Sequence, residues 1–186
     1  CGARPLAFTL ALALPAADPL WLEPFAQGLL ALARAHDCEL VGGDTTAGPL
    51  NICITVFGEV PAAGGHAQAL LRSGARVGDD IHVSGTLGDA RLALEALRGQ
   101  WTLPPDLHAL ATTRLHQPAP RIALGLALRG VAHAAIDISD GLLGDLGHVL
   151  RRSAVGATVD ADAAAALLGV RALGWQAPVE TMRDLA

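Results

Sequence analysis

Two short acidic segments hold the residues whose types and spacing are best suited to chemistry. The first is Gly-Gly-Asp-Thr-Thr at residues 42–46, and the second is Asp-Ile-Ser-Asp-Gly at residues 137–141. Each follows an apolar stretch that predicts a strand, and its glycine indicates a loop. Carboxylate and hydroxyl oxygens on such loops are the ligands that Mg²⁺ with a bound polyphosphate requires, because hard cations prefer oxygen and glycine leaves room for phosphate.

Each acid also has a simpler structural explanation. Asp44 after two glycines is typical of a turn aspartate that hydrogen-bonds its own loop, and Asp140 is well placed to cap a helix that starts near Gly141. Asp137 and Asp140 nevertheless lie very close in sequence. Like charges that close are unfavourable unless a cation or several N–H donors compensate them. The residues alone leave both explanations open.

The composition excludes several mechanisms of phosphate chemistry. The chain has 13 arginines and no lysine, whereas a Walker loop, a protein-kinase β3 position and a Schiff-base cofactor site each need a lysine. If phosphate is bound here, arginine, backbone N–H groups and metal ions must bind it.

The bulk properties fit a globular protein of one or two domains. The chain has 186 residues, 52% of them hydrophobic, and a net charge of −5. An acidic chain without a basic stripe gives no reason to expect a nucleic-acid partner, and the longest apolar runs fall short of the roughly 20 residues that span a membrane. Cys1, Cys38 and Cys53 form no Cys-x-x-Cys pair, which predicts reduced, buried thiols in a cytoplasmic protein.

The first part of the chain predicts strands around one helix. An apolar run from Leu6 to Leu14 predicts a strand buried on both faces, and Asp18-Pro19 predicts the start of a helix that ends near His36. Further strands are predicted at Cys38–Val41 and Leu50–Val60, with the first acidic segment in the loop between them. An uncharged Gly/Pro-rich stretch, Pro61 to Gly65, then marks a domain boundary.

The second part predicts strands alternating with helices, so the fold class is α/β, or more broadly α+β. The predicted domains are residues 1–62 and residues 63–186. In the second domain, strands are predicted at Asp79–Gly85, Val131–Ile138 and Thr158–Asp160, and helices at Asp89–Arg98, Pro120–Arg129 and Leu142–Arg152.

The helix predicted at Leu142–Arg152 is strongly amphipathic. Its apolar residues share one face, and Asp145, His148, Arg151 and Arg152 lie opposite. Asp145 and His148 have a spacing that suits a zinc pair. Their position on the polar face favours a solvated surface instead.

Five ordered segments carry a resemblance to a known family, the thiamine-monophosphate kinases. They begin at Val41, Arg72, Val83, Pro120 and Ala135, and read Val-Gly-Gly-Asp-Thr-Thr-Ala-Gly-Pro-Leu, Arg-Ser-Gly-Ala, Val-Ser-Gly-Thr-Leu-Gly-Asp-Ala, Pro-Arg-Ile-Ala-Leu-Gly and Ala-Ile-Asp-Ile-Ser-Asp-Gly-Leu. The family belongs to the superfamily of aminoimidazole ribonucleotide synthetase and selenophosphate synthetase. The Asp-Thr-Thr at residues 44–46 points to the thiamine enzyme within it.

The resemblance implies a role for each site residue. Asp44, Asp137 and Asp140 would ligate Mg²⁺, and Gly43, Asp44 and Ser139 would contact ATP. Arg72 would bind ATP phosphate, and in a chain without lysine its guanidinium is the natural fork-shaped ligand. From the residues alone, a solvated linker arginine is the simpler explanation of Arg72.

The resemblance also implies the activity and the architecture. The activity would be ATP-dependent phosphorylation of thiamine monophosphate to thiamine diphosphate, by a homodimer with the two-domain fold of aminoimidazole ribonucleotide synthetase and a Mg–ATP site shared between the domains. The start of the first domain and the end of the second would lie outside this sequence, so the fragment alone would be inactive. Two alternatives remain: another ATP-using enzyme of the superfamily, and a relative that binds ATP or Mg²⁺ without catalysis.

Overall fold

The computed structural model describes residues 2–169, which fall into two compact units. The first unit contains the chain up to Ala69 together with Ile122–Arg129, and the second contains Leu70–Arg121 and the chain from Gly130 onward. Strands and helices are mixed, which confirms the predicted α/β class. The domain division at residues 62 and 63 stays a prediction.

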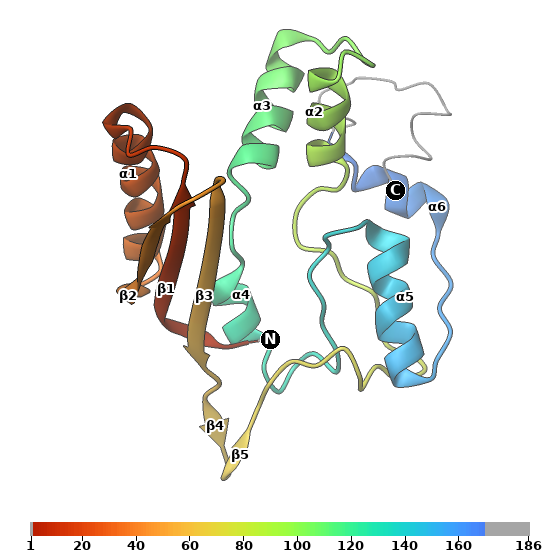
Figure 1. The fold of residues 1–186 in the computed structure, drawn as a ribbon. Coiled ribbons are helices and arrows are strands. Elements are labelled where there is room, and N and C mark those ends of the chain that lie inside the picture. Colours follow the sequence, from red (N-terminus) through yellow and green to blue (C-terminus); the bar gives the residue numbers. More distant parts are fainter. Residues whose placement is uncertain (1, 170–186) are drawn as a thin grey trace. The chain divides into compact units, whose positions relative to one another are not determined.

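The described residues form five strands and six helices, labelled in Figure 1. Among them, none of the helices has the length and apolarity needed to cross a membrane. The elements in chain order are β1 (Arg4–Leu14), α1 (Pro19–Ala35), β2 (Glu39–Ala47), β3 (Asn51–Glu59), β4 (Ala62–Ala63), β5 (His66–Ala67), α2 (Asp89–Leu97), α3 (Pro105–His116), α4 (Ile122–Ala127), α5 (Leu142–Ser153) and α6 (Ala161–Ala166).

The first unit contains a small sheet in the order β2-β1-β3, with β1 parallel to β2 and antiparallel to β3. The connection from β1 to β2 is α1, which lies alongside β2 (Figure 1). The predicted helix start is confirmed, because the Asp18 side chain accepts a hydrogen bond of 3.0 Å from the Leu20 N–H and Pro19 occupies the first helical position. β1 and β3 also lie where the sequence predicts them.

The prediction that the first strand is buried on both faces is wrong. On β1, Phe8, Leu12 and Leu14 are buried on one face, whereas Ala11 on the other face is exposed. A sheet face becomes buried only where a second layer covers it, and none of the residues on β2, β3 or α1 is buried. The thiol prediction is likewise wrong for Cys53, which is free but exposed.

Cys38 is free and half-buried. Cys1 lies outside the described residues.

The second unit has a core built mainly by α2 and α3, which pack side by side (Figure 1). Leu92 and Leu107 are its most deeply buried large side chains. The helices predicted at Asp89–Arg98 and Leu142–Arg152 are confirmed as α2 and α5, and the helix predicted at Pro120–Arg129 is confirmed as α4, which belongs to the first unit. Helix α3 was not predicted, although Pro105 at its first turn is a recognised start signal.

Three strands predicted in the second unit are absent from the described residues. The segments 79–85, 131–138 and 158–160 have no regular structure. A strand requires a neighbour to form a ladder of hydrogen bonds. Among the described residues, the 131–138 segment makes one backbone hydrogen bond to another segment, from the Ala135 N–H to the Leu71 carbonyl at 2.9 Å. Its apolar residues are also poorly covered, since Val131 is 72% exposed.

Polar contacts of Asp79 connect two of the segments that replace these strands, 79–85 and 131–138. Its Oδ2 accepts a hydrogen bond of 2.8 Å from the Arg76 N–H, and its Oδ1 lies 2.8 Å from His133 Nδ1. The Arg76 hydrogen bond is the main cause that lowers the pKa of Asp79 below its ordinary value of 3.8, and the His133 contact adds to it. Asp79 therefore joins the segment before it to the segment that leads to the second acidic motif.

Replacing Asp79 with Asn is expected to destabilise the protein in a pH-dependent way. Because the folded-state pKa is depressed, the stabilising contribution is fully present above pH 3.8 and is lost as pH falls through the lower folded-state pKa. Urea unfolding at several pH values should therefore show that the difference in free energy of unfolding between wild type and variant disappears in acid. Asp80→Asn, at an exposed neighbouring acid, is the control. A difference in free energy of unfolding that stays constant with pH would contradict the stabilising role of the ionised Asp79.

Candidate functional site

The first acidic motif lies within a strand, and the prediction that it forms a loop is wrong. Residues 42–46 belong to β2, where Gly43 pairs with Leu10 and Asp44 pairs with Ala11 of β1. The register shifts between Phe8 and Thr9, which leaves Val41 as an extra residue in β2. Such a bulge bends a strand and redirects the side chains that follow it. The motif therefore begins directly after an irregularity in an otherwise paired strand.

Gly43 is required by the pairing of β2 with β1. Its φ is +150°, and a Cβ atom there would lie 1.9 Å from the Leu10 carbonyl oxygen. Any side chain at this position would push the two strands apart. Gly42 has no atom within 4 Å of the corresponding Cβ position. The two adjacent glycines thus have different reasons to be present, and only Gly43 is explained by backbone packing.

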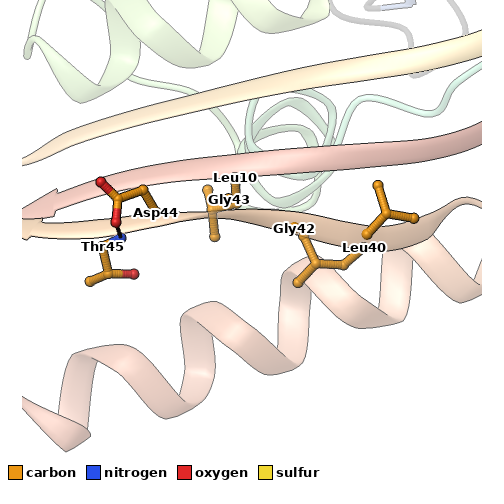
Figure 2. A pocket seen from close by; sticks show the side chains of 7 residues that line it. Leu10, Leu40, Gly42, Gly43, Asp44 and Thr45 are labelled. Carbon is orange, nitrogen blue, oxygen red and sulfur yellow. Dashed lines mark hydrogen bonds between the residues drawn. The ribbon is translucent and has the colours of Figure 1, made fainter.

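Asp44 lies beside a groove of about 520 Å³ whose walls come from β2 and β1. Its Oδ1 accepts a hydrogen bond of 2.9 Å from the Thr45 N–H, drawn as a dashed line in Figure 2. Gly42 and Gly43 leave the strand backbone uncovered next to this carboxylate (Figure 2). All the β2 residues are exposed, so the groove is accessible to a polar ligand.

The second acidic motif is a loop that leads into α5. Ser139 Oγ donates a hydrogen bond of 2.6 Å to Asp137 Oδ2, and this contact is the main cause that lowers the pKa of Asp137. The positive charge of Arg72 lowers that pKa further. The side chains of Asp137, Ser139 and Asp140 are exposed. The structure thus presents an ionised Asp137 and a second acid, Asp140, to solvent on one short loop.

Asp145 holds this loop in place, and the sequence pattern does not predict that role. The residue is only 5% exposed, and its Oδ2 accepts hydrogen bonds from the backbone N–H groups of Ser139 at 2.8 Å and Asp140 at 3.1 Å. The expectation of a solvated Asp145 is therefore wrong, whereas His148 is exposed as expected. The position of Asp145 in the first helical turn could have indicated this role, because an acid there can accept hydrogen bonds from N–H groups just before the helix.

Arg72 lies on a second loop that α5 also holds. Ser153 Oγ, at the end of α5, accepts hydrogen bonds of 3.1 Å from both the Gly74 and the Ala75 N–H groups, and donates to the Arg72 carbonyl at 3.4 Å. Arg72 itself is exposed. The candidate residues therefore fall into two groups: Gly43 and Asp44 in the first unit, and Arg72, Asp137, Ser139 and Asp140 in the second.

The donor set fits Mg²⁺ bound together with phosphate. Within residues 2–169, no group of three or more His, Cys, Asp or Glu side chains converges to enclose a metal ion. Mg²⁺ commonly uses one or two carboxylates and completes its coordination with substrate phosphates and water. The Asp137–Asp140 loop offers carboxylate and hydroxyl oxygens, with no sulfur or imidazole donor among them. This donor chemistry suits a hard cation and does not suit zinc.

Comparison with known proteins gives the same family from sequence and from structure. The family model for AIR synthase related protein, N-terminal domain, matches residues 1–60. The thiamine-monophosphate kinase of Salmonella typhimurium is 48% identical over 164 residues, which are 87% of this chain and 49% of the relative.

Two solved structures agree with that sequence match. Thiamine-monophosphate kinase from Stenotrophomonas maltophilia K279a has a TM-score of 0.84 at 49% identity, over 98% of this chain and 57% of its own. AaThiL complexed with AMPPCP and TMP has a TM-score of 0.72 at 32% identity, over 82% of this chain and 48% of its own.

The α/β fold and the family-model match over residues 1–60 make the chain similar to AIR synthase related proteins. Among these, the chain is similar to thiamine-monophosphate kinases over most of its length, which confirms the resemblance seen in the five sequence segments. The chain spans about half the length of the curated relatives it matches.

Proposed function

We propose that this protein transfers the γ-phosphoryl group of ATP onto the phosphate of thiamine monophosphate, giving thiamine diphosphate. The relative AaThiL, solved with AMPPCP and TMP, supports this choice of substrates. The observation that carries the proposal is the exposed acidic loop at residues 137–140, where Ser139 favours an ionised Asp137. An acceptor phosphate is already anionic near neutral pH. The reaction therefore needs positioning and charge neutralisation, and no catalytic base.

Each candidate residue has a role in this proposal. Asp44, Asp137 and Asp140 would hold Mg²⁺, which when bound neutralises charge on the transferring phosphoryl group. Gly43 and Ser139 would contact ATP, because glycine lets a nucleotide approach the β2 backbone and the serine hydroxyl is a hydrogen-bond donor. Arg72 would bind phosphate through its guanidinium. In the same scheme, residues 1–62 belong to an ATP- and Mg-binding domain and residues 63–186 to a second α/β domain.

The proposal includes a cytoplasmic homodimer. One face of β3 exposes three apolar side chains, Ile52, Ile54 and Val56, which are 43%, 43% and 59% exposed. A contiguous apolar surface of this kind is typical of a protein interface, and a second copy of the same sheet would cover it. Light scattering of the full-length protein should give twice the mass of the chain, and a monomer at micromolar concentration would contradict the dimer.

A product assay tests the proposed reaction. The full-length protein is incubated with ATP, Mg²⁺ and thiamine monophosphate, and thiamine diphosphate is separated by chromatography. We expect diphosphate formation that requires both Mg²⁺ and the monophosphate, with no product from unphosphorylated thiamine because the acceptor phosphate is missing. Formylglycinamidine ribonucleotide, the substrate of the alternative superfamily reaction, is the second control. Turnover of that compound in place of thiamine monophosphate would overturn the proposal.

A further inference from the structure

We propose that helix α5 positions both candidate phosphate-binding loops of the second unit, through Asp145 near its start and Ser153 at its end. This inference rests on the proposed function, because it explains how the Asp137–Asp140 loop and the Arg72 loop would be kept ready for Mg²⁺ and phosphate. Neither Asp145 nor Ser153 is assigned to touch substrate. Both would act as positioning residues.

Asp145 is a buried acid whose hydrogen bonds all go to the loop. The two backbone N–H groups that it binds belong to Ser139 and Asp140, and no ion pair in the described part of the chain includes Asp145. A buried carboxylate is unfavourable unless hydrogen-bond donors compensate it. The loop N–H groups and the positive end of the α5 dipole provide that compensation. The acid and the loop conformation therefore stabilise each other.

The geometry of these bonds determines where the exposed acids point. Because the N–H groups of Ser139 and Asp140 are directed inward to Asp145, the side chains of both residues remain exposed. Gly141 completes the arrangement with φ +115° and ψ 154°, a conformation that is essentially restricted to glycine. The chain can therefore leave the loop and enter α5 directly, with Asp145 in the first helical turn.

Ser153 holds the loop that bears Arg72 in the same way. Its hydroxyl uses its full hydrogen-bonding capacity, accepting from the Gly74 and Ala75 N–H groups and donating to the Arg72 carbonyl. Gly74 fits closely against another segment, because a Cβ there would lie 2.6 Å from the His133 carbonyl oxygen. The backbone on both sides of Arg72 is thus held by residues distant in sequence.

A single helix connects the two anchors. Asp145 and Ser153 are eight residues apart, or about 12 Å along a helix axis at 1.5 Å per residue. A helix keeps such a separation constant, so the two loops cannot move independently while both anchors hold.

The test measures MgATP binding separately from catalysis in the full-length protein. Asp145→Ala removes both hydrogen bonds to the loop, whereas Asp145→Asn keeps a carbonyl oxygen that can replace Oδ2. We expect Asp145→Ala to raise the Kd of MgATP by about tenfold or more, since hydrogen bonds to a charged acceptor are the stronger class. Asp145→Asn should stay within about threefold of wild type. Ser153→Ala should weaken binding by roughly threefold to tenfold.

Val149→Ala is the matched control, because Val149 is a buried residue of the same helix that makes no side-chain hydrogen bond to either loop. Urea unfolding establishes that each variant is folded under the binding conditions. If Val149→Ala binds MgATP with the Kd of wild type while Asp145→Ala and Ser153→Ala bind it more weakly, the result supports positioning by Asp145 and Ser153. Equal losses in Val149→Ala and Asp145→Ala would overturn it, as would unchanged binding in Asp145→Ala.

An Asp145→Asn variant as weak as Asp145→Ala would also overturn the inference, because it would show that the carboxylate charge supports MgATP binding by a route other than acceptance of the two loop hydrogen bonds. Wild-type protein that binds MgATP but forms no thiamine diphosphate would count against the proposed reaction alone.

Discussion

Asp140→Asn in the full-length protein is expected to lower turnover by on the order of 100-fold and to shift the Mg²⁺ dependence to higher concentration. Asn preserves the shape of the side chain but removes its negative charge, and the charge stabilisation supplied by a bound metal contributes several kcal/mol to the transition state. A loss of about 1.4 kcal/mol corresponds to a tenfold lower rate. Steady-state kinetics across a Mg²⁺ titration measure both effects.

The control for this substitution is Asp80→Asn, which makes the same charge change at an exposed acid of the same unit. Its kinetics should match wild type at every Mg²⁺ concentration. If Asp140→Asn also matched wild type across the titration, Asp140 would not be a metal ligand. A lower turnover with unchanged Mg²⁺ dependence would instead indicate that Asp140 acts on ATP or on the loop.

Gly43→Ala is expected to destabilise the first unit by roughly 3 kcal/mol. The methyl group would collide with the Leu10 carbonyl oxygen, and the backbone at Gly43 has a φ that L residues rarely adopt. Strained backbone costs about 1–3 kcal/mol, and overpacking costs about 1–3 kcal/mol in addition. That sum is a large part of the roughly 5–15 kcal/mol that stabilises a typical domain. Chemical unfolding followed by circular dichroism measures the loss.

Gly42→Ala is the matched control on the adjacent residue. Its Cβ would enter open space, so the free energy of unfolding should change by no more than about 0.5–1 kcal/mol in either direction. Similar destabilisation by the two alanines would show that the collision with β1 is not the reason for Gly43. Because Gly42 lines the groove beside Asp44, nucleotide binding by the folded Gly42→Ala variant reports separately on access to that groove.

Local signals predicted the elements that depend on local chemistry. Asp18-Pro19 located the start of α1 because capping and a fixed proline φ act within one turn. The apolar pattern located α5 for the same kind of reason. The strand predicted at Val131–Ile138 failed because pairing depends on a distant segment, and an apolar run carries no information about whether such a neighbour is present.

The sequence predicts which residues belong to the candidate site better than it predicts their local structure. The acids of both motifs were identified from residue type, yet the first motif was assigned to a loop because glycine is uncommon in strands. In the structure, the absence of a side chain at Gly43 is what permits strand pairing. Asp145 was placed on a solvated face by its helical position, because periodicity does not reveal that a preceding loop supplies N–H donors to it.

The extra residue at Val41 determines which side of the sheet carries the carboxylate. After the register shift, Asp44 pairs with Ala11, whereas an uninterrupted ladder continuing from the Phe8–Leu40 pair would set Asp44 opposite Leu12. Paired residues project to the same side, and Leu12 belongs to the buried side of β1. The unpaired residue, as well as residue identity, therefore sets the side to which this acid projects. Pairing Val41 with Thr9 would move Asp44 to the side of Leu12 without altering a single letter of Gly-Gly-Asp-Thr-Thr, whereas deleting Val41 would leave Asp44 opposite Ala11.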